Sequence, residues 1–208
     1  NSRYTAARIE KYYRRPSEVI YPPVCAIAAV ESGAIDIWDR PFVTVSRLSK
    51  YKHVEAIVRA FAKLGLPLLV IGDGRESEQL RRNAPPNVRF LGDVSDSELG
   101  AALGRARAFV FAGEEDFGLA LAEAQMAGLP AIALASGGAR EIVEEDVSGV
   151  FFPDSDAESI VAAVQRYIDQ ESSFDREKIR KQAERFSEER FREAMNAIIM
   201  KCIGENKK

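Results

Sequence analysis

The sequence predicts an α/β protein built on a doubly wound parallel sheet of six strands. Six short apolar runs, rich in Val, Ile, Leu and Phe, alternate with longer segments whose apolar residues recur at helical spacing. Gly or Pro bounds most of these runs, as is common where strands and helices end. Strands that alternate with helices form βαβ units, and the resulting parallel sheet is covered by helices on both faces.

The six predicted strands each contain four or five mostly apolar residues. They cover residues 42–46, 68–71, 88–91, 108–112, 131–135 and 149–152. A further short strand, outside this alternation, is expected at Val19–Tyr21, where Pro22 and Pro23 would stop it.

Helices are predicted between the strands, and several begin at residues that cap well. Ser2 opens the first helix, which runs to Tyr13, and Asp156 and Ser187 open two later ones. The other intervals predict helices near residues 53–64, 75–83, 95–106, 118–127 and 139–144, and two helices end the chain. The helix after Gly118 lacks a broad polar face, so we expect it to be buried nearly all round.

This pattern divides the chain into three regions. Residues 1–41 form a linker segment with the leading helix and strand, residues 42–170 contain the sheet, and residues 171–208 contain the C-terminal helices. The pattern is weak between residues 24 and 40, which indicates a connector or flexible loop. The opening residues resemble the middle of a longer chain, so we expect further residues before them.

The composition argues against several classes of protein. The chain has 208 residues and a formal net charge of −3, with Lys and Arg interleaved among Asp and Glu, so no nucleic-acid partner is expected. No apolar run reaches membrane-spanning length. Cys25 and Cys202 match no metal or redox spacing, which favours a reducing compartment, and the sequence does not show whether they pair.

The ligand site is expected at the carboxyl ends of the strands, as in other doubly wound sheets. The groups at this edge are residues 47–52, 72–74, 92–94, 113–118 and 136–138. Arg47 and Lys52 would offer a forked and a point positive charge, which suits a diphosphate beside helix N-termini. The alternative is that Arg47 only forms an ion pair with Glu115 or Glu123, and both interpretations can hold at once.

Glu123 is the second acidic candidate. Its place about a turn and a half into an apolar helix makes an ionised carboxylate costly unless a partner hydrogen-bonds it. An ion pair with Arg or Lys, or exposure at the helix edge, would explain the residue, and so would a carboxylate that holds ligand hydroxyls. Structural ion pairs resemble functional sites, so the spacing leaves these alternatives open.

Other kinds of chemistry find less support. Gly72-Asp-Gly74 lacks the third glycine of a dinucleotide fingerprint, so a tight turn is the preferred interpretation. Asp154 and Asp156 look like a metal-binding pair, but capping by Asp156 is favoured. No Ser-His-Asp set or Cys–His pair supports nucleophilic hydrolysis, and His53, the sole histidine, is assigned no role.

Seven segments, in order along the chain, resemble glycosyltransferase family 4, whose enzymes have the GT-B fold. They are Val45–Leu48 with Lys52, Ile71–Gly74, Phe90–Gly92, Glu114–Leu119 with Glu123, Ala127–Pro130, Gly137–Glu141 and Ser148–Phe152. The likeness runs from about Ser2 to Met200 and corresponds to the C-terminal, nucleotide-sugar-binding domain, which is Rossmann-like. The opening segment resembles the one that joins the two GT-B domains, so we expect the N-terminal, acceptor-binding domain to be missing.

The resemblance implies transfer of a hexosyl group from a nucleoside-diphosphate sugar, with retention and without a required metal. It implies catalytic roles for Arg47 and Lys52, which would stabilise the leaving diphosphate, and for Glu115, which would hold the sugar hydroxyls. The positions that it implies for donor binding are Gly72, Gly92, Val94, Phe117, Gly118, Leu119 and Glu123. Of these, Glu123 would accept from the ribose, and the backbone from Gly92 to Val94 would meet the base.

The form of the Glu115–Gly118 loop is similar to that of mannosyltransferases of surface-polysaccharide assembly. GDP-mannose is therefore the first expected donor, and a UDP-hexose is the alternative.

The other expected partners are a glycan or lipid-linked acceptor, the missing domain, and a second copy of this chain. The second copy would bind through an apolar stripe of the last helix, and the alternative is that this stripe packs on its own sheet. We expect a cytoplasmic protein, peripheral at the inner membrane face through the missing domain, and an isolated chain without activity. A non-catalytic nucleotide- or sugar-binding module is the alternative to an enzyme.

Overall fold

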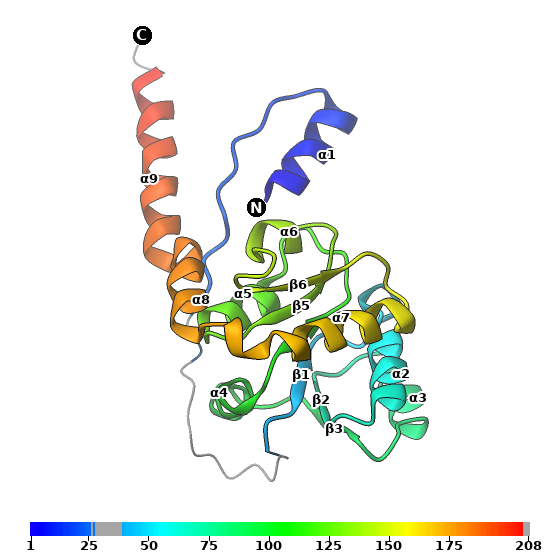
Figure 1. Ribbon diagram of the computed structural model, residues 1–208. Helices are drawn as coiled ribbons and strands as arrows, with labels where there is room; N and C mark the ends of the chain where they lie inside the picture. Colours follow the sequence, from blue (N-terminus) through cyan, green and yellow to red (C-terminus); the bar gives the residue numbers. More distant parts are fainter. Residues whose placement is uncertain (26, 28–38, 206–208) are drawn as a thin grey trace.

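A six-stranded parallel sheet forms the centre of the computed structural model, which describes residues 1–25, 27 and 39–205. Helices cover both faces of the sheet (Figure 1). The strands are β1 (Phe42–Val45), β2 (Leu68–Ile71), β3 (Val88–Gly92), β4 (Phe109–Phe111), β5 (Ala131–Leu134) and β6 (Gly149–Phe152). The predicted doubly wound sheet is confirmed, and the bounds of each strand agree with the prediction to within one residue.

The order of the strands is β3-β2-β1-β4-β5-β6, so it reverses between β1 and β4. These two strands pair in parallel, with Val43 opposite Phe109. The loops that follow strands on either side of such a reversal turn toward opposite faces of the sheet, which leaves a crevice between them at the carboxyl edge. The topology therefore places the expected site above β1 and β4.

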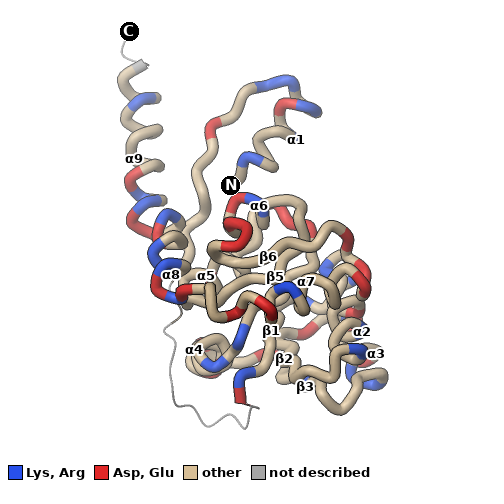
Figure 2. The backbone as a smooth tube through the Cα atoms, viewed as in Figure 1, with Lys and Arg blue, Asp and Glu red and all other residues tan. Residues whose placement is uncertain are grey.

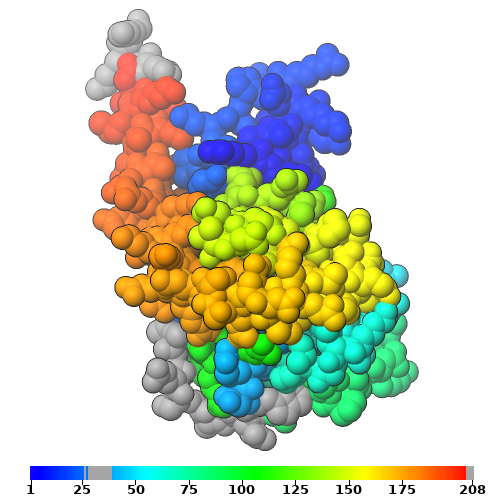
Figure 3. All heavy atoms as spheres, viewed as in Figure 1, coloured from blue at the N-terminus to red at the C-terminus, as the bar shows by residue number. Residues whose placement is uncertain are grey.

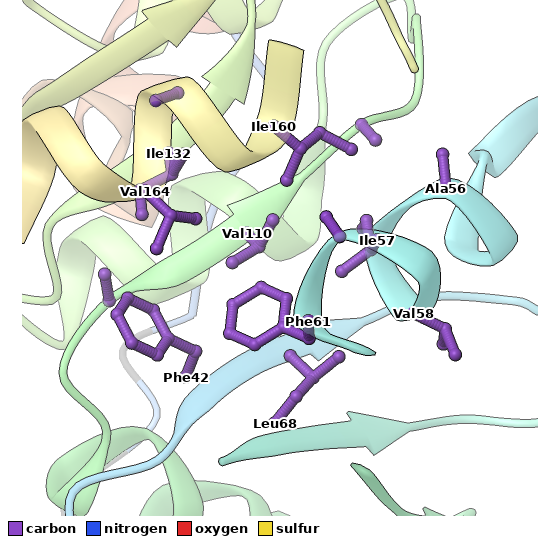
Figure 4. Close-up of a cluster of buried hydrophobic side chains, with 14 of the residues drawn as sticks. Phe42, Ala56, Ile57, Val58, Phe61, Leu68, Val110, Ile132, Ile160 and Val164 are labelled. Carbon is purple, nitrogen blue, oxygen red and sulfur yellow. The ribbon is translucent and has the colours of Figure 1, made fainter. Parts of the chain in front are cut away.

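Alternate residues of each strand enter two separate cores. On one face, Phe42, Val110 and Ile132 pack against Phe61 of α2 (Val54–Leu64) and Ile160 of α7 (Ala157–Asp169) (Figure 4). On the opposite face, the strands pack against α4 (Asp96–Arg105), α5 (Leu119–Met126) and α6 (Ala139–Ile142). Because both faces of most strands are buried, the strands are mostly apolar in sequence, with Thr44 in β1 and Arg89 in β3 as exceptions.

The remaining helices are α1 (Arg3–Tyr13), α3 (Ser77–Arg82), α8 (Arg176–Ala183) and α9 (Glu188–Glu205), and short 3-10 turns lie at η1 (Lys50–Lys52), η2 (Glu171–Ser173) and η3 (Glu184–Phe186). Helices α1, α4, α7 and α8 begin at residues whose side chains cap them. Ser95 forms a complete capping box with Glu98 at the start of α4. The Asp156 carboxylate accepts from the Ser159 N–H at 2.8 Å, which confirms its predicted role as a cap.

The predicted strand at Val19–Tyr21 is wrong. These residues join no sheet, and Val24, further on, forms an isolated bridge to Ser187. Pro22 and Pro23 have no N–H to donate to a ladder, and the Tyr21 ring packs against other aromatic rings instead. Most of the connector predicted at residues 24–40 lies outside the described residues.

Helix α9 leaves the body of the molecule beyond α8 (Figures 1 and 3). Phe191, Met195 and Ile198 of its predicted stripe are only half-buried, and Cys202 is exposed. The interpretation that this stripe packs on its own sheet is therefore wrong. Cys25 is also exposed, and both cysteines are free thiols.

Charged residues of both signs are spread along the chain (Figure 2). Blue and red segments both occur on several helices and loops in this view, as the interleaved sequence predicts. Among the residues that the structure describes, none of the helices combines the length and the apolar character needed to cross a bilayer.

Replacing Phe42 by Ala should lower the free energy of unfolding by about 3–5 kcal/mol, because the side chain is fully buried and its loss leaves a cavity. Its ring packs edge-on against Phe61, with centroids 5.1 Å apart, and against Tyr167 at 5.9 Å. Urea unfolding measures the change. Tyr13→Ala is the control, since Tyr13 is 76% exposed and its loss should cost less than about 0.5 kcal/mol. Equal effects of the two substitutions would contradict this view of the core.

Candidate functional site

A hollow of about 870 Å³ opens at the carboxyl edge of the sheet, where the strand order reverses. The loops after β1, β2, β3 and β4 contribute to its wall, together with the start of α5 and the N-terminal segment. Most of the predicted site residues line it, namely Arg47, Lys52, Gly72, Glu115, Phe117, Gly118 and Leu119. The topology therefore brings together residues that lie far apart in the sequence.

Lys52 and Glu115 form an ion pair in the hollow, between the loop after β1 and the loop after β4. The Lys52 Nζ donates a hydrogen bond to Glu115 Oε1, and the two side chains are 12% and 25% exposed. The Nζ also lies 4.9 Å from the centre of the Tyr51 ring, which is a cation–π contact. Both charged groups are thus partly desolvated, held in place and still open to the hollow.

Arg47 does not form the ion pair with Glu115 or Glu123 that the sequence left open. The partner of Glu115 is Lys52, and within the described part of the chain Arg47 forms no ion pair. Its side chain is exposed on the wall of the hollow. The guanidinium is therefore free to take an anion, and a planar guanidinium binds phosphate oxygens well.

Helix α5 begins at the wall of the hollow. Gly118 precedes its first residue with φ 103°, a left-handed conformation that favours glycine. The first N–H groups of a helix have no partner inside it, and they carry partial positive charge that attracts anions. Leu119 is 48% exposed at this point, so the expectation that α5 is buried nearly all round is wrong on the side that faces the hollow.

Two glycines after β5 allow a second loop to support the one that carries Glu115. A Cβ on Gly137 would stand 2.3 Å from the Glu115 carbonyl oxygen, and one on Gly138 would stand 2.3 Å from the Phe117 carbonyl oxygen. The Gly138 N–H donates to the Glu115 carbonyl at 2.8 Å. The two loops therefore touch backbone to backbone, which only glycine permits.

Three predicted positions, Gly92, Val94 and Glu123, are not in the wall of the hollow. Gly92 is buried, and its carbonyl accepts from the Gly72 N–H at 2.8 Å, which ties the ends of β2 and β3 together. Val94 packs against the core beside α4. Asp93, which stands between them, does face the hollow, so this loop presents a side chain there that the sequence did not single out.

Glu123 lies on the flank of α5, beyond the wall of the hollow. Burial raises the pKa of its carboxyl, and the nearby Asp96 carboxylate raises it further. Within the described residues no Lys or Arg pairs with Glu123, so the ion-pair alternative finds no support. The residue is a half-buried acid without a positive partner, which is costly for the fold.

Five of the residues that line the hollow are acidic, and the sequence had named only one of them, Glu115, as a site residue. Asp73, Asp93, Glu114 and Asp116 also line it. Each is a direct neighbour of a residue already singled out, so adjacency in the loops was the available signal. Hydrogen bonds from Ser136 and Tyr4 lower the pKa of the Glu114 carboxyl, which keeps it ionised. Many carboxylates around a small cationic corner suit a ligand that carries both hydroxyl donors and an anionic group.

The fold and the hollow together define a doubly wound, Rossmann-like domain with a candidate site at the carboxyl edge of its sheet. A family model described as glycosyl transferases group 1 matches residues 32–186. The chain belongs to this family. The expected Rossmann-like domain of a GT-B glycosyltransferase is thereby confirmed.

Two similar relatives are GDP-mannose-dependent alpha-mannosyltransferases. The one from Mycolicibacterium smegmatis is 38% identical over 106 residues, which is 50% of this chain and 28% of the relative. The one from Corynebacterium glutamicum is 30% identical over 125 residues, which is 60% of this chain and 30% of the relative. This chain therefore matches less than a third of the length of either relative.

A solved structure of sucrose-phosphate synthase from Thermosynechococcus elongatus has the same fold. It superposes with a TM-score of 0.84 at 22% identity, over 99% of this chain and 58% of that one. The superposition extends over α1 and α9 as well as the sheet, because nearly the whole chain is covered.

Replacing Glu123 by Gln should stabilise the protein at neutral pH, because an amide carries no charge to desolvate. The folded-state pKa of Glu123 is raised above its ordinary value of 4.5, so below that value both folded and unfolded states hold the proton and the charge costs nothing. As the pH rises, the unfolded state ionises first, and wild-type stability falls until the pH passes the raised pKa.

Thermal unfolding of wild type and Glu123→Gln from pH 4 to 8 measures this difference. The two melting temperatures should be close at pH 4 and should separate toward pH 8, with the variant higher. Glu177→Gln is a control on the exposed first turn of α8. A variant that is less stable than wild type at pH 8 would show that Glu123 has a positive partner.

Proposed function

We propose that this chain is the donor-binding domain of a retaining hexosyltransferase that uses GDP-mannose. The observation that carries the proposal is the Lys52–Glu115 pair, with exposed Arg47 beside it and the start of α5 in the same wall. One corner of the hollow is cationic, and acidic and apolar residues line the rest. A nucleoside-diphosphate sugar has the matching chemistry, since its diphosphate is anionic and its sugar and ribose carry hydroxyl donors.

In this proposal the diphosphate lies between Lys52, Arg47 and the first N–H groups of α5. The Lys52 ammonium has three donors, so it can bind a phosphate oxygen while it still donates to Glu115. Glu115 then accepts from the sugar hydroxyls, with the N–H groups of Phe117, Gly118 and Leu119 nearby. The base would lie along Gly92–Val94, and Glu123 would accept from the ribose once the donor reaches the flank of α5.

The proposed reaction needs no nucleophile from the chain. The bond between the sugar C1 and the phosphate oxygen breaks, and its electron pair stays with the diphosphate. The acceptor oxygen bonds to C1 on the same face and passes its proton to the leaving phosphate oxygen. Arg47 and Lys52 would stabilise the negative charge that develops there, which is commonly the largest contribution in such transfers.

GDP-mannose is the proposed donor because two relatives named for that donor share 30–38% identity with this chain. A UDP-hexose remains the alternative that the experiment must test. The chain spans less than a third of those relatives, and we propose that the whole protein also has an N-terminal domain. We further propose a glycan or lipid-linked acceptor, held by that domain, and no activity of the isolated chain.

The exposed face of α9 supports one further part of the proposal. Ile199, Met200 and Ile203 are 46%, 68% and 47% exposed near its end. In the isolated chain, a second copy could cover this face in a homodimer, which light scattering at increasing concentration would detect.

Calorimetric titration tests the proposal directly. The domain should bind GDP-mannose more tightly than UDP-glucose, and the affinity should not change on addition of magnesium. Lys52→Ala should weaken binding about 10- to 100-fold, because it removes a charge-assisted hydrogen bond of roughly 1.5–3 kcal/mol.

Lys63→Ala is the matched control for Lys52→Ala. Lys63 forms an exposed ion pair with Glu158 on the surface of α2 and α7, so its loss should leave the affinity unchanged. Arg47→Ala is a second variant that spares the fold, because Arg47 is exposed. Wild-type affinity in both Lys52→Ala and Arg47→Ala would contradict the proposed site.

A further inference from the structure

Glu141 joins segments that lie more than a hundred residues apart in the sequence. Its carboxylate accepts hydrogen bonds from the backbone N–H groups of Arg3 and Tyr4, both at 2.9 Å. It also accepts from the Tyr21 hydroxyl at 2.9 Å. Together with Ser2 Oγ, which accepts from the Thr5 N–H at 2.9 Å, it caps the start of α1.

The place of α1 depends on polar contacts of this kind. None of the residues of α1 itself is buried, and the helix lies against α6 at the edge of the body (Figures 1 and 3). Its other anchors reach the loop that carries Glu115. The Tyr4 hydroxyl donates to Glu114 at 2.6 Å, and Arg8 donates to Asp116 at 2.6 Å. The acids on both sides of Glu115 are therefore held by α1.

Tyr21 connects Glu141 to the same loop from the other side. Its ring lies 5.8 Å from that of Phe117 and 5.1 Å from that of Phe186, and these last two rings are 5.2 Å apart. Burial and the hydrogen bond to Glu141 raise the pKa of the Tyr21 hydroxyl, so it keeps the proton that it donates. The Phe117 ring therefore packs in a cluster with Tyr21 and Phe186, and Glu141 holds the Tyr21 side chain of this cluster by a hydrogen bond.

A short backbone path also leads from Glu141 to Glu115. The Glu141 N–H donates to the Gly138 carbonyl at 2.9 Å, and the Gly138 N–H donates to the Glu115 carbonyl at 2.8 Å. Glu141 therefore acts on the loop 114–117 through three routes: helix α1, the Tyr21 ring and the backbone of residues 138–141.

We propose that Glu141 is a positioning residue that sets the conformation of the loop 114–117, and with it the place of Glu115 in the hollow. This inference rests on the proposed function, in which Glu115 holds the sugar. Without the carboxylate, the start of α1 and the Tyr21 hydroxyl lose their acceptor, and the loop loses anchors on both sides of Glu115. The sugar should then bind less well, while the contacts of the diphosphate with Lys52 and Arg47 stay unchanged.

Glu141→Gln tests this role, because the amide keeps the size of the side chain but turns an NH₂ group toward donors. The variant should bind GDP-mannose about tenfold more weakly, equivalent to about 1.4 kcal/mol, and should bind GDP with wild-type affinity. Tyr21→Phe, which removes one of the three donors and keeps the ring, should show a smaller loss in the same direction. Calorimetry with both ligands gives the ratio of the two affinities.

The control is Glu144→Gln, the same chemical change just beyond the end of α6 at an exposed side chain that accepts from Gln182. It should leave the ratio of affinities as in wild type. A purely structural role for Glu141 would lower the melting temperature and leave that ratio unchanged, and this result would overturn the inference.

Hydrogen exchange of the backbone separates failure of the inference from failure of the proposed function. If wild type binds neither GDP nor GDP-mannose, the proposed function fails, but exchange in the peptide 114–121 still reports on the loop. Faster exchange there in Glu141→Gln than in Glu144→Gln would support the positioning role, and equal exchange would overturn it.

Discussion

The pairing of β1 with β4 is the constraint on which the whole site depends. These strands are neighbours in the sheet although two other strands separate them in the sequence. Their carboxyl ends bring Lys52 and Glu115 into one hollow across 63 residues of chain. An ion pair between partly buried side chains is stable only when both are held in place, and here the sheet itself holds the two loops.

Close contacts between loops fix the positions of the site residues more narrowly than the sheet alone does. Gly72 approaches the Ser46 carbonyl, where a Cβ would stand 2.2 Å away, and Gly137 and Gly138 approach the loop of Glu115 in the same way. Such contacts between backbones leave little freedom for the side chains between them. The first helix attaches differently, because Glu114, Asp116 and Glu141 hold it by hydrogen bonds and ion pairs rather than by a core. The site thus combines loops fixed by backbone contacts with a first helix that is held by charged and polar contacts.

Much of the fold could be predicted from the sequence, because its signals are local. The strands are buried on both faces, so they appear as apolar runs, and caps such as Ser95 and Asp156 bind N–H groups three residues ahead. The error at Val19–Tyr21 has the opposite cause. Those residues suit a strand by composition, but Tyr21 is placed by Phe117 and Phe186, which no local pattern reveals.

The candidate site was only partly predictable for the same reason. The loops that form it could be predicted because parallel strands share one carboxyl edge. The ion-pair partner of each charged residue could not be predicted, because it depends on how side chains from distant loops meet. In the structure Lys52, and not Arg47, pairs with Glu115. Glu123 follows Glu115 closely in the sequence but lies outside the wall of the hollow, because the packing of α5 decides which of its sides faces the crevice.

A crystal structure of the domain soaked with GDP tests the central claim most directly. The diphosphate should lie within hydrogen-bonding distance of Lys52 Nζ and the Arg47 guanidinium, beside the start of α5. A cavity of about 400 Å³ at the amino edge of the sheet, lined in part by Arg40, Arg107 and Arg176, offers cations at a different place. Density for the diphosphate in that cavity, with none beside Lys52, would contradict the account.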